Sequence, residues 1–231
     1  LSRRQRQMCI RDRAQHANSA KTLFMSQMSH DIRTPLNAIL GMSMIAQEHI
    51  SDAARVNDCL EKIQTSGHQL LEIINNVLDL SAIESGKTTL ASEPFDLKVF
   101  IDDTAGTIRT LTDKKRQRFV VEISEGINYS VIGDQAKLRQ LLMNILSNAV
   151  KYTPDGGEIH LSVKELNPDH HGVCRYLFTV KDNGIGMSQE FLHKIYDPFV
   201  RADDHRISGI QGTGLGMAIA INIARMMNCD I

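Results

Sequence analysis

Two long stretches with helical apolar spacing, joined by a short turn, constrain the fold of this chain more than any other feature. Apolar residues recur every three or four positions in Ala14–Ile50, and again after the capping pair Ser51-Asp52 until Ser85-Gly86 ends the pattern. A two-helix hairpin cannot bury stripes of this length by itself. The sequence therefore predicts an all-α helical hairpin that forms a homodimeric four-helix bundle. The stripes are Met25, Met28, Ile32, Leu36 and Ile39 in the first stretch and Val56, Leu60, Ile63, Leu70, Ile74 and Val77 in the second.

The first thirteen residues are treated separately. Leu1–Arg13 resembles the translation of a transposase adapter used to prepare sequencing libraries, and we leave it out of the fold prediction. If so, the chain is part of a longer protein. The alternative is a basic helical linker that continues into Ala14.

The pattern changes after Gly86. Helices are expected over Phe95–Leu111, Asp134–Tyr152 and Leu215–Met227, with a short helix over Gln189–Tyr196. Phe119–Ile123 is expected to be a strand, and Glu158–Leu166 and Tyr176–Lys181 alternate like neighbouring strands with one covered face. The second half therefore predicts an α+β two-layer sandwich.

Composition excludes several classes of function. The net charge is -1, Trp is absent, and the four cysteines form no C-x-x-C pair, so nucleic-acid binding, a disulfide framework and a zinc knuckle are not expected. Because no apolar run approaches the ~20 residues that cross a bilayer, no membrane contact is expected from this segment, which we expect to be cytoplasmic. A membrane anchor elsewhere in the parent protein stays open.

His30 is the first residue along the chain whose side chain could take part in a chemical reaction. At about 100° per residue it lies roughly 200° around the helix from Met28 and Ile32, so its imidazole should face solvent. Asp31 adjoins it, and Thr34 follows one turn later. Pro35 should kink the helix there, and a proline in a helix interior costs ~3 kcal/mol of helix stability. The plainer interpretation is a surface histidine, but that does not explain the proline.

Three further groups favour a nucleotide site. Asn144, Asn148 and Tyr152 share one helix face with Lys151 alongside; amide oxygens can bind Mg²⁺, and lysine can balance phosphate charge. Asp182 precedes Gly184 and Gly186, where a carboxylate could accept an exocyclic amine beside a flat ring. The run Gly212-Thr213-Gly214-Leu215-Gly216 opens the last helix with amides suited to an anion. Taken singly, these asparagines can be caps and these glycines turns.

Together the motifs resemble the transmitter region of bacterial sensor histidine kinases, from about Ser19 to Ile231. They are SHDIRTPLN, LRQLLMNILSNAVKYT, DNGIGM, YDPFVRADD and GTGLGMAIA, in that order. The resemblance implies a dimerisation and histidine-phosphotransfer hairpin followed by an ATP-binding domain of the type shared with DNA gyrase, the Hsp90 chaperones and MutL. It divides the chain into residues 14–87, a hinge at 88–96 that includes Pro94, and a catalytic domain at 97–231.

The resemblance also implies the roles of single residues. His30 would be the phosphoacceptor, Asp31 the acid that orients it, and Thr34 the support for water attack in the phosphatase reaction. Asn148, with Asn144, would bind Mg²⁺. At the phosphates, the expected contacts are Lys151 and the run Gly212, Thr213, Gly214, Leu215 and Gly216. At adenine, they are Tyr152, Asp182, Gly184 and Gly186. Phe199 and Arg201 would belong to the lid (about 200–211), with Arg201 approaching the γ-phosphate.

The implied function is autophosphorylation of His30 by Mg-ATP, followed by transfer to an aspartate of a response regulator receiver domain, with phosphatase activity. Two alternatives remain: a non-catalytic dimerisation and signalling module with an unfilled nucleotide pocket, and a gyrase-like or chaperone-like ATPase, which would not use His30.

The sequence departs from this family at its end, where two closing strands are expected and the chain stops at Ile231. The ATP-binding domain is therefore expected to be incomplete, to expose Leu215, Ile219, Ile223 and Met226 of the last helix, and to bind ATP poorly, while the hairpin dimerises.

Overall fold

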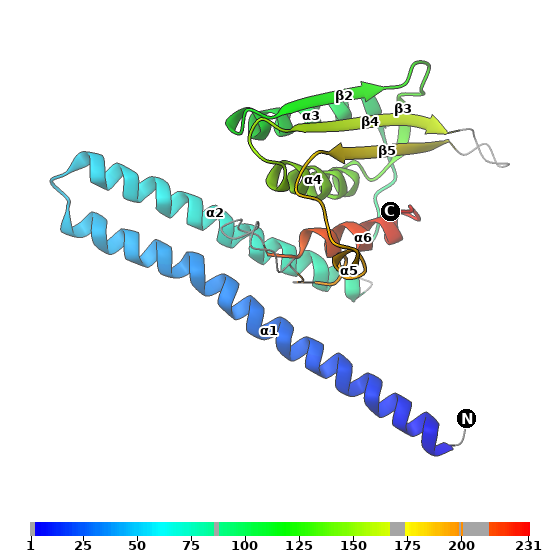
Figure 1. Ribbon diagram of the computed structural model, residues 1–231, viewed down its shortest axis with the longest axis horizontal. Coiled ribbons are helices and arrows are strands. Elements are labelled where there is room, and N and C mark those ends of the chain that lie inside the picture. Colours follow the sequence, from blue (N-terminus) through cyan, green and yellow to red (C-terminus); the bar gives the residue numbers. More distant parts are fainter. Residues whose placement is uncertain (1–2, 86–87, 167–173, 199, 201–212) are drawn as a thin grey trace. The chain divides into compact units, whose positions relative to one another are not determined.

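The computed structural model describes residues 3–85, 88–166, 174–198, 200 and 213–231 (Figure 1). The chain divides into two compact units, Leu1–Leu78 and Asp79–Ile231. Each unit is described by itself below.

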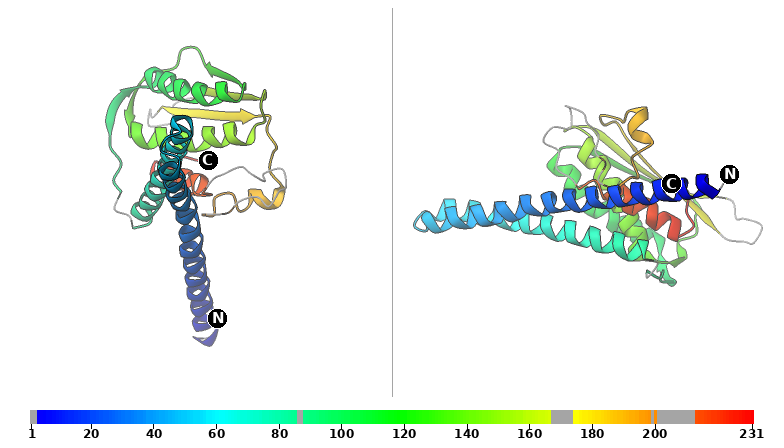
Figure 2. Two further views of the ribbon diagram at one scale, coloured as in Figure 1. Left: turned by 90° about the vertical axis from the view of Figure 1, so that its left-hand side faces the viewer. Right: turned by 90° about the horizontal axis from the view of Figure 1, so that it is seen from below.

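The first unit is built on a helical hairpin. Helix α1 spans Arg3–Glu48 and helix α2 spans Ala53–Glu84, and Figure 1 shows them running in opposite directions from a short turn. The Asp52 side chain accepts a hydrogen bond from the backbone N–H of Arg55 over 3.1 Å and so caps α2, as expected. The backbone is helical from Arg3. Helix α1 also continues through Pro35, without a break in the helix (Figure 2).

Much of the apolar surface of the hairpin is uncovered within one copy of the chain. Met28, Cys59 and Ile73 are buried. Other large apolar residues of both helices are exposed, and Met44 and Leu78 keep more than 60% of their accessible surface, at 64% and 63%. An exposed apolar face of this kind is typical of a surface that a partner covers. The other exposed residues are Met25, Leu36, Leu40, Ile50, Leu60, Leu71 and Ile74.

The described part of the second unit contains two sheets, with helices packed against the larger one. Strands β2, β4 and β5 form a mixed sheet in that order, in which β2 is parallel to β4 and β4 is antiparallel to β5. Strands β1 and β3 form a separate antiparallel pair. The bounds are β1 Glu93–Asp96, α3 Leu97–Lys114, β2 Arg118–Ile123, β3 Ser130–Gly133, α4 Gln135–Tyr152, β4 Glu158–Leu166, β5 Arg175–Asp182, α5 Gln189–Leu192 and α6 Gly216–Met226.

The core lies between the mixed sheet and the helices α3 and α4, and it continues between α4 and α6 (Figure 1). Alternate residues of β4 are fully buried on the helix side, as the predicted alternation requires. Asp96 and Asp134 cap α3 and α4 by accepting hydrogen bonds from the backbone N–H groups of Val99 and Lys137, over 2.9 Å each. The central residues are Phe100, Ile108, Leu146, Ile159, Leu161, Val163 and Ile219.

Two sequence expectations change in this unit. Leu215, Ile219 and Ile223 of the last helix have no accessible surface, so the expectation that they are exposed is wrong; Met226 is half-buried. Helix α6 packs against α4, and this contact covers them. Glu93–Asp96, expected to belong to the hinge, forms β1 instead, because its backbone pairs with β3.

Candidate functional site

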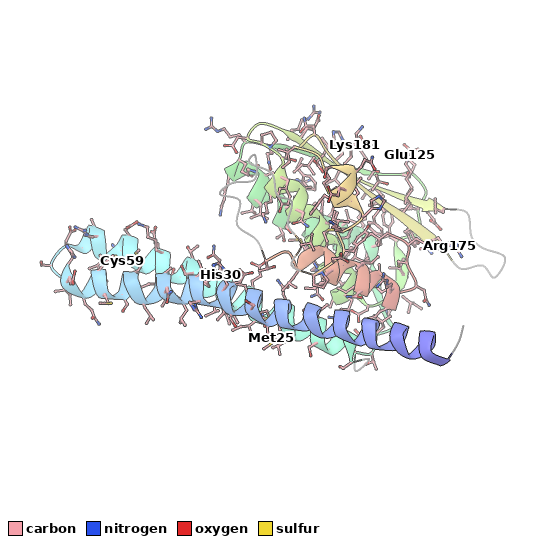
Figure 3. The ribbon with its side chains drawn as sticks, turned by 60° about the horizontal axis from the view of Figure 1, so that its bottom comes forward. Met25, His30, Cys59, Glu125, Arg175 and Lys181 are labelled. Atoms are coloured by element: carbon pink, nitrogen blue, oxygen red, sulfur yellow. The ribbon has the colours of Figure 1, made fainter. Side chains whose placement is uncertain are left out.

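His30 lies on the exposed side of α1, as its position relative to Met28 predicts (Figure 3). Its side chain keeps 79% of its accessible surface, and its Nδ1 lies 3.3 Å from Oδ1 of Asp31. A carboxylate at Nδ1 favours the tautomer with the proton on that nitrogen, which leaves the Nε2 lone pair free. The structure therefore presents an accessible nucleophilic nitrogen to solvent.

Thr34 is bonded to the helix turn that carries the histidine. Its hydroxyl donates a hydrogen bond to the carbonyl oxygen of His30 over 3.1 Å, one turn back along α1. Pro35 follows directly and lacks the N–H that would donate to the carbonyl of Asp31. The Thr34 side chain is exposed, and its hydroxyl oxygen keeps lone pairs that can accept a hydrogen bond from water.

The asparagine face of α4 lies in the second unit and meets the start of α6. A Cβ built on Gly216 would lie 3.5 Å from Oδ1 of Asn144, so α6 begins in contact with this asparagine. The Asn144 Nδ2 is buried and has no hydrogen-bond partner among the described residues. Such an amide is costly unless a ligand or water satisfies it. Asn148 is half-buried one turn further along α4.

The end of α4 carries the other two residues of this group. The ammonium of Lys151 lies 4.9 Å from the centre of the Tyr152 ring, a distance typical of a cation–π contact. Both side chains are half-buried. The cation and the aromatic ring expected beside phosphate and adenine are thus adjacent.

The loop after β5 closes onto the end of α4. Oδ1 of Asp182 accepts a hydrogen bond from the backbone N–H of Gly184 over 2.9 Å. The N–H of Ile185 donates to the carbonyl oxygen of Tyr152 over 3.2 Å. A Cβ on Gly184 would lie 2.6 Å from that carbonyl oxygen, and Gly186 has a φ of +68°. Both positions therefore require glycine, for close approach in one case and for the left-handed conformation in the other.

The glycine run before α6 leaves the N-terminus of that helix without a side-chain cap. Leu215 occupies the N-cap position, and its N–H donates to the hydroxyl oxygen of Thr213 over 3.3 Å. Gly214 has a φ of +69°. The Leu215 side chain lies in the core, so only its backbone can face a ligand. The N–H groups that open α6 thus suit an anion such as a phosphate.

Three predicted residues, Phe199, Arg201 and Gly212, lie outside the described residues, as does most of the expected lid. Sequence reasoning missed Lys115, Gln117 and Asn183. Lys115 and Gln117 donate to carbonyl groups at the end of α4, and Oδ1 of Asn183 accepts the N–H of Glu158 over 2.8 Å. For Lys115 and Gln117, the sequence signal was a polar side chain shortly after the end of a predicted helix.

The residues present fit Mg-ATP. Across the described ranges, no three His, Cys, Asp or Glu side chains gather as a metal site. Mg²⁺ commonly takes only one or two protein ligands and fills its shell with phosphate oxygens and water, so a site based on amide oxygens is compatible with it. The buried Nδ2 of Asn144, which lacks a hydrogen-bond partner among the described residues, is a donor suited to a phosphate oxygen, and Oδ1 of the same side chain lies beside the uncapped start of α6.

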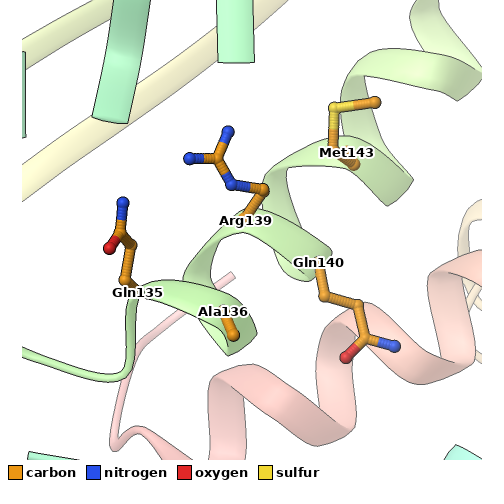
Figure 4. A pocket seen from close by; sticks show the side chains of 5 residues that line it. All are labelled: Gln135, Ala136, Arg139, Gln140 and Met143. Carbon is orange, nitrogen blue, oxygen red and sulfur yellow. The ribbon is translucent and has the colours of Figure 1, made fainter. Parts of the chain in front are cut away.

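A concavity lies on α4 away from the predicted nucleotide residues. It is an open depression of about 540 Å³ lined by residues of the N-terminal half of the helix (Figure 4). None of the predicted site residues lines it. Nε2 of Gln140, one of the lining residues, donates a hydrogen bond to Oδ2 of Asp79 over 2.6 Å. This depression is therefore separate from the predicted nucleotide residues. The lining residues are Gln135, Ala136, Arg139, Gln140 and Met143.

Comparisons with known families match both units. Residues 20–86 match the His Kinase A (phospho-acceptor) domain, and residues 133–231 match the family described as histidine kinase-, DNA gyrase B-, and HSP90-like ATPase. Among the described residues, no helix combines the length and apolar character needed to cross a membrane.

Individual relatives agree with these matches. The chain is 34% identical over 218 residues to the sensory/regulatory protein RpfC of Xanthomonas campestris, covering 94% of this chain and 30% of the relative. It is 32% identical over 222 residues to the autoinducer 2 sensor kinase/phosphatase LuxQ of Vibrio vulnificus, covering 95% and 26%. The chain thus spans less than a third of these curated relatives. The solved structure of full-length ShkA in complex with AMPPNP is similar with a TM-score of 0.65 at 26% identity, covering 91% of this chain and 41% of that one.

Proposed function

Because the chain belongs to the sensor histidine kinases, as their transmitter region, we propose that it phosphorylates His30 with the γ-phosphoryl group of Mg-ATP and then passes that group to an aspartate of a response regulator receiver domain. The observation that carries the proposal is the exposed His30–Asp31 pair in a chain that also holds a nucleotide-type cluster on α4 and α6.

The tautomer of His30 defines the first step. Nδ1–H is directed to the Asp31 carboxylate, and Nε2 attacks the γ-phosphorus. The bond between Nε2 and phosphorus forms while the bond from phosphorus to the bridging β,γ oxygen breaks, and ADP leaves with that electron pair. The imidazolium that results returns to neutrality when Asp31 takes the Nδ1 proton. Asp31 thus orients the ring and stabilises the cation.

The residues of the second unit would hold the nucleotide. Asn148 and Asn144 would bind the cation, which neutralises charge on the phosphates when bound. Lys151 and the N–H groups that open α6 would hold phosphate oxygens. Tyr152 and Asp182 would bound the adenine, with the Asp182 carboxylate accepting from the exocyclic amine. Catalysis is then mainly positioning and charge stabilisation.

Transfer requires the two units to meet during each cycle. His30 belongs to the first unit, and the nucleotide residues belong to the second. The proposed hinge lies between α2 and β1, and the strand at Glu93–Asp96 shortens it from residues 88–96 to residues 88–92. Phe199 and Arg201 belong to the proposed lid over the γ-phosphate.

The exposed apolar stripes of α1 and α2 support a homodimer. A second copy that covers Leu40, Met44 and Leu71 would complete a four-helix bundle and remove that apolar surface from water. Each side chain so buried would contribute about 1.5–3 kcal/mol. The phosphatase activity of the proposal is supported by the position of Thr34, and a relative is named a sensor kinase/phosphatase.

The test is incorporation of label from γ-labelled ATP into the purified chain. We expect Mg-dependent label that is acid-labile and base-stable, absent in His30→Gln and unchanged in His68→Gln, which alters an exposed histidine of α2. Full incorporation by His30→Gln would overturn the assignment of the acceptor. ATP binding without any label in the wild type would favour the non-catalytic alternative.

A further inference from the structure

The end of α4 is held by a lysine that the proposed mechanism does not use. The last carbonyl groups of an α-helix lack partners within the helix. Nζ of Lys115, which follows α3, donates to the carbonyl oxygens of Val150 over 2.9 Å, Lys151 over 3.3 Å and Thr153 over 2.7 Å. One ammonium group therefore satisfies several carbonyl groups at the end of α4.

Gln117, the residue before β2, completes this arrangement. Its Nε2 donates to the carbonyl oxygens of Val150 over 3.0 Å and Thr153 over 2.7 Å, with a longer contact of 3.3 Å to Pro154. The Gln117 side chain is 6% exposed, so water does not compete freely for these carbonyls. The two side chains together fix the last turn of α4 against the turn between α3 and β2.

The carbonyl of Tyr152, in the last turn of α4, is bonded neither to Lys115 nor to Gln117 but to the loop after β5. The oxygen of Tyr152 accepts the N–H of Ile185, and Gly184 approaches it so closely that no Cβ fits. The loop that follows Asp182 is therefore placed by the position of the Tyr152 carbonyl. Displacement of the last turn of α4 would move both the ring and the loop expected to bound adenine.

The charge of Lys115 suits this place. The C-terminus of a helix carries partial negative charge, and charge-assisted hydrogen bonds are stronger than neutral ones. The side chain is half-buried, which reduces screening by solvent. A neutral side chain of similar length would leave carbonyl oxygens of the last turn with fewer donors.

We infer that Lys115 is a positioning residue for nucleotide recognition, acting through the last turn of α4 on Tyr152 and the loop at Gly184. The inference rests on the proposed function, because it assumes that adenine binds beside Tyr152 and the loop at Gly184. Lys115 contacts backbone carbonyl groups and is not a catalytic residue.

The experiment measures the dissociation constants of Mg-ATP and Mg-GTP by calorimetric titration of the full chain, well below the melting temperature of each variant. We expect Lys115→Met to weaken ATP binding about tenfold and to reduce the preference for ATP over GTP, because the adenine wall is displaced. Lys115→Arg keeps the charge and the donors and should restore most of both. Lys114→Met changes the exposed neighbouring lysine and should leave both unchanged.

Three outcomes separate the possibilities. Unchanged affinity and preference in Lys115→Met overturn the inference. Equal weakening for ATP and GTP, accompanied by a smaller folded fraction, indicates a purely structural role and overturns it as well. Should Lys115→Met not fold, Lys115→Gln, which keeps one donor group, carries the same test. Failure of the wild type to bind ATP would instead contradict the proposed function.

Discussion

The backbone N–H of Ile185 donates a hydrogen bond to the carbonyl oxygen of Tyr152 over 3.2 Å and so joins the loop after β5 to the end of α4. The end of α4 at Tyr152 and the loop at Gly184, which are far apart in the sequence, thereby lie side by side. The first prediction depends on how closely they approach.

Gly184→Ala should impair nucleotide binding. The added methyl group would lie 2.6 Å from the Tyr152 carbonyl oxygen and 2.7 Å from Oδ1 of Asp182, so the loop must move. We expect ATP affinity to fall by more than tenfold in titrations of the folded variant. Gly106→Ala is the matched control, because nothing lies within 4 Å of that position in α3. It should preserve binding and stabilise the helix by up to about 1 kcal/mol. Equal binding by both variants would contradict the close approach.

Asn148→Asp should abolish autophosphorylation while the protein stays folded. The substitution keeps the shape of the side chain but adds a negative charge beside the phosphates, and it alters the ligand offered to the cation. Asn75→Asp makes the same chemical change at an exposed position of α2 and should leave the rate unchanged. Normal label incorporation by Asn148→Asp, followed over a range of Mg²⁺ concentrations, would remove Asn148 from the cation site.

Thr34→Ala should lower phosphatase activity on a phosphorylated receiver domain and largely spare kinase activity. The hydroxyl lies one turn from His30 and can orient a water molecule, whereas the nucleophile is the imidazole itself. Thr34→Ser keeps the hydroxyl and should retain both activities. Equal loss of both activities in Thr34→Ala would indicate general damage to the helix around Pro35.

The stability of the second unit should depend on the ionisation of Asp134. Burial by itself raises the pKa of this carboxyl, but the N–H groups of Lys137 and Ala91, with the Lys137 ammonium, outweigh burial and hold the pKa below its ordinary value. Because the pKa is lower in the folded state, this stabilisation is complete above the unfolded pKa of about 3.9 and is lost as pH falls through the folded pKa.

Asp134→Asn should therefore cost about 1 kcal/mol at pH 7, because the carboxylate accepts from Lys137 on Oδ1 and from Ala91 on Oδ2, whereas the amide has a single, uncharged acceptor oxygen. The difference from the wild type should shrink as the pH falls below about 4. Thermal unfolding from pH 7 to pH 3 measures it. A difference that stays constant over this range would show that the charge of Asp134 does not stabilise the fold.

Arg116→Gly should stabilise the second unit. Arg116 has a φ of +51°, in the left-handed region where a non-glycine residue is strained by about 1 kcal/mol. Its neighbours Lys115 and Gln117 stay in place, since only the side chain at the turn changes. We expect a gain of about 0.5–1 kcal/mol in the free energy of unfolding in urea. Arg116→Ala keeps the Cβ and should show no such gain, so a similar effect of the two substitutions would point to the lost charge instead.

Most of the secondary structure could be predicted because it depends on short-range patterns. The spacing of apolar residues predicted both hairpin helices, and the alternation over Glu158–Leu166 predicted β4 with its observed bounds. Strands β1 and β3 were missed. Each has four residues, too few to show a period, and each is defined by pairing with the other. The short α5 ends at Leu192, before the expected Tyr196.

The sequence by itself determined the hairpin, the exposure of His30 and the order of the motifs, since each depends on neighbouring residues and helix geometry. Only the tertiary structure decided that α6 starts against Asn144, that β2 runs parallel to β4, and that Lys115 and Gln117 hold the end of α4. These contacts join residues far apart in the chain, and no local period encodes them. They form because helix ends, buried amides and apolar faces must find partners when the layers pack.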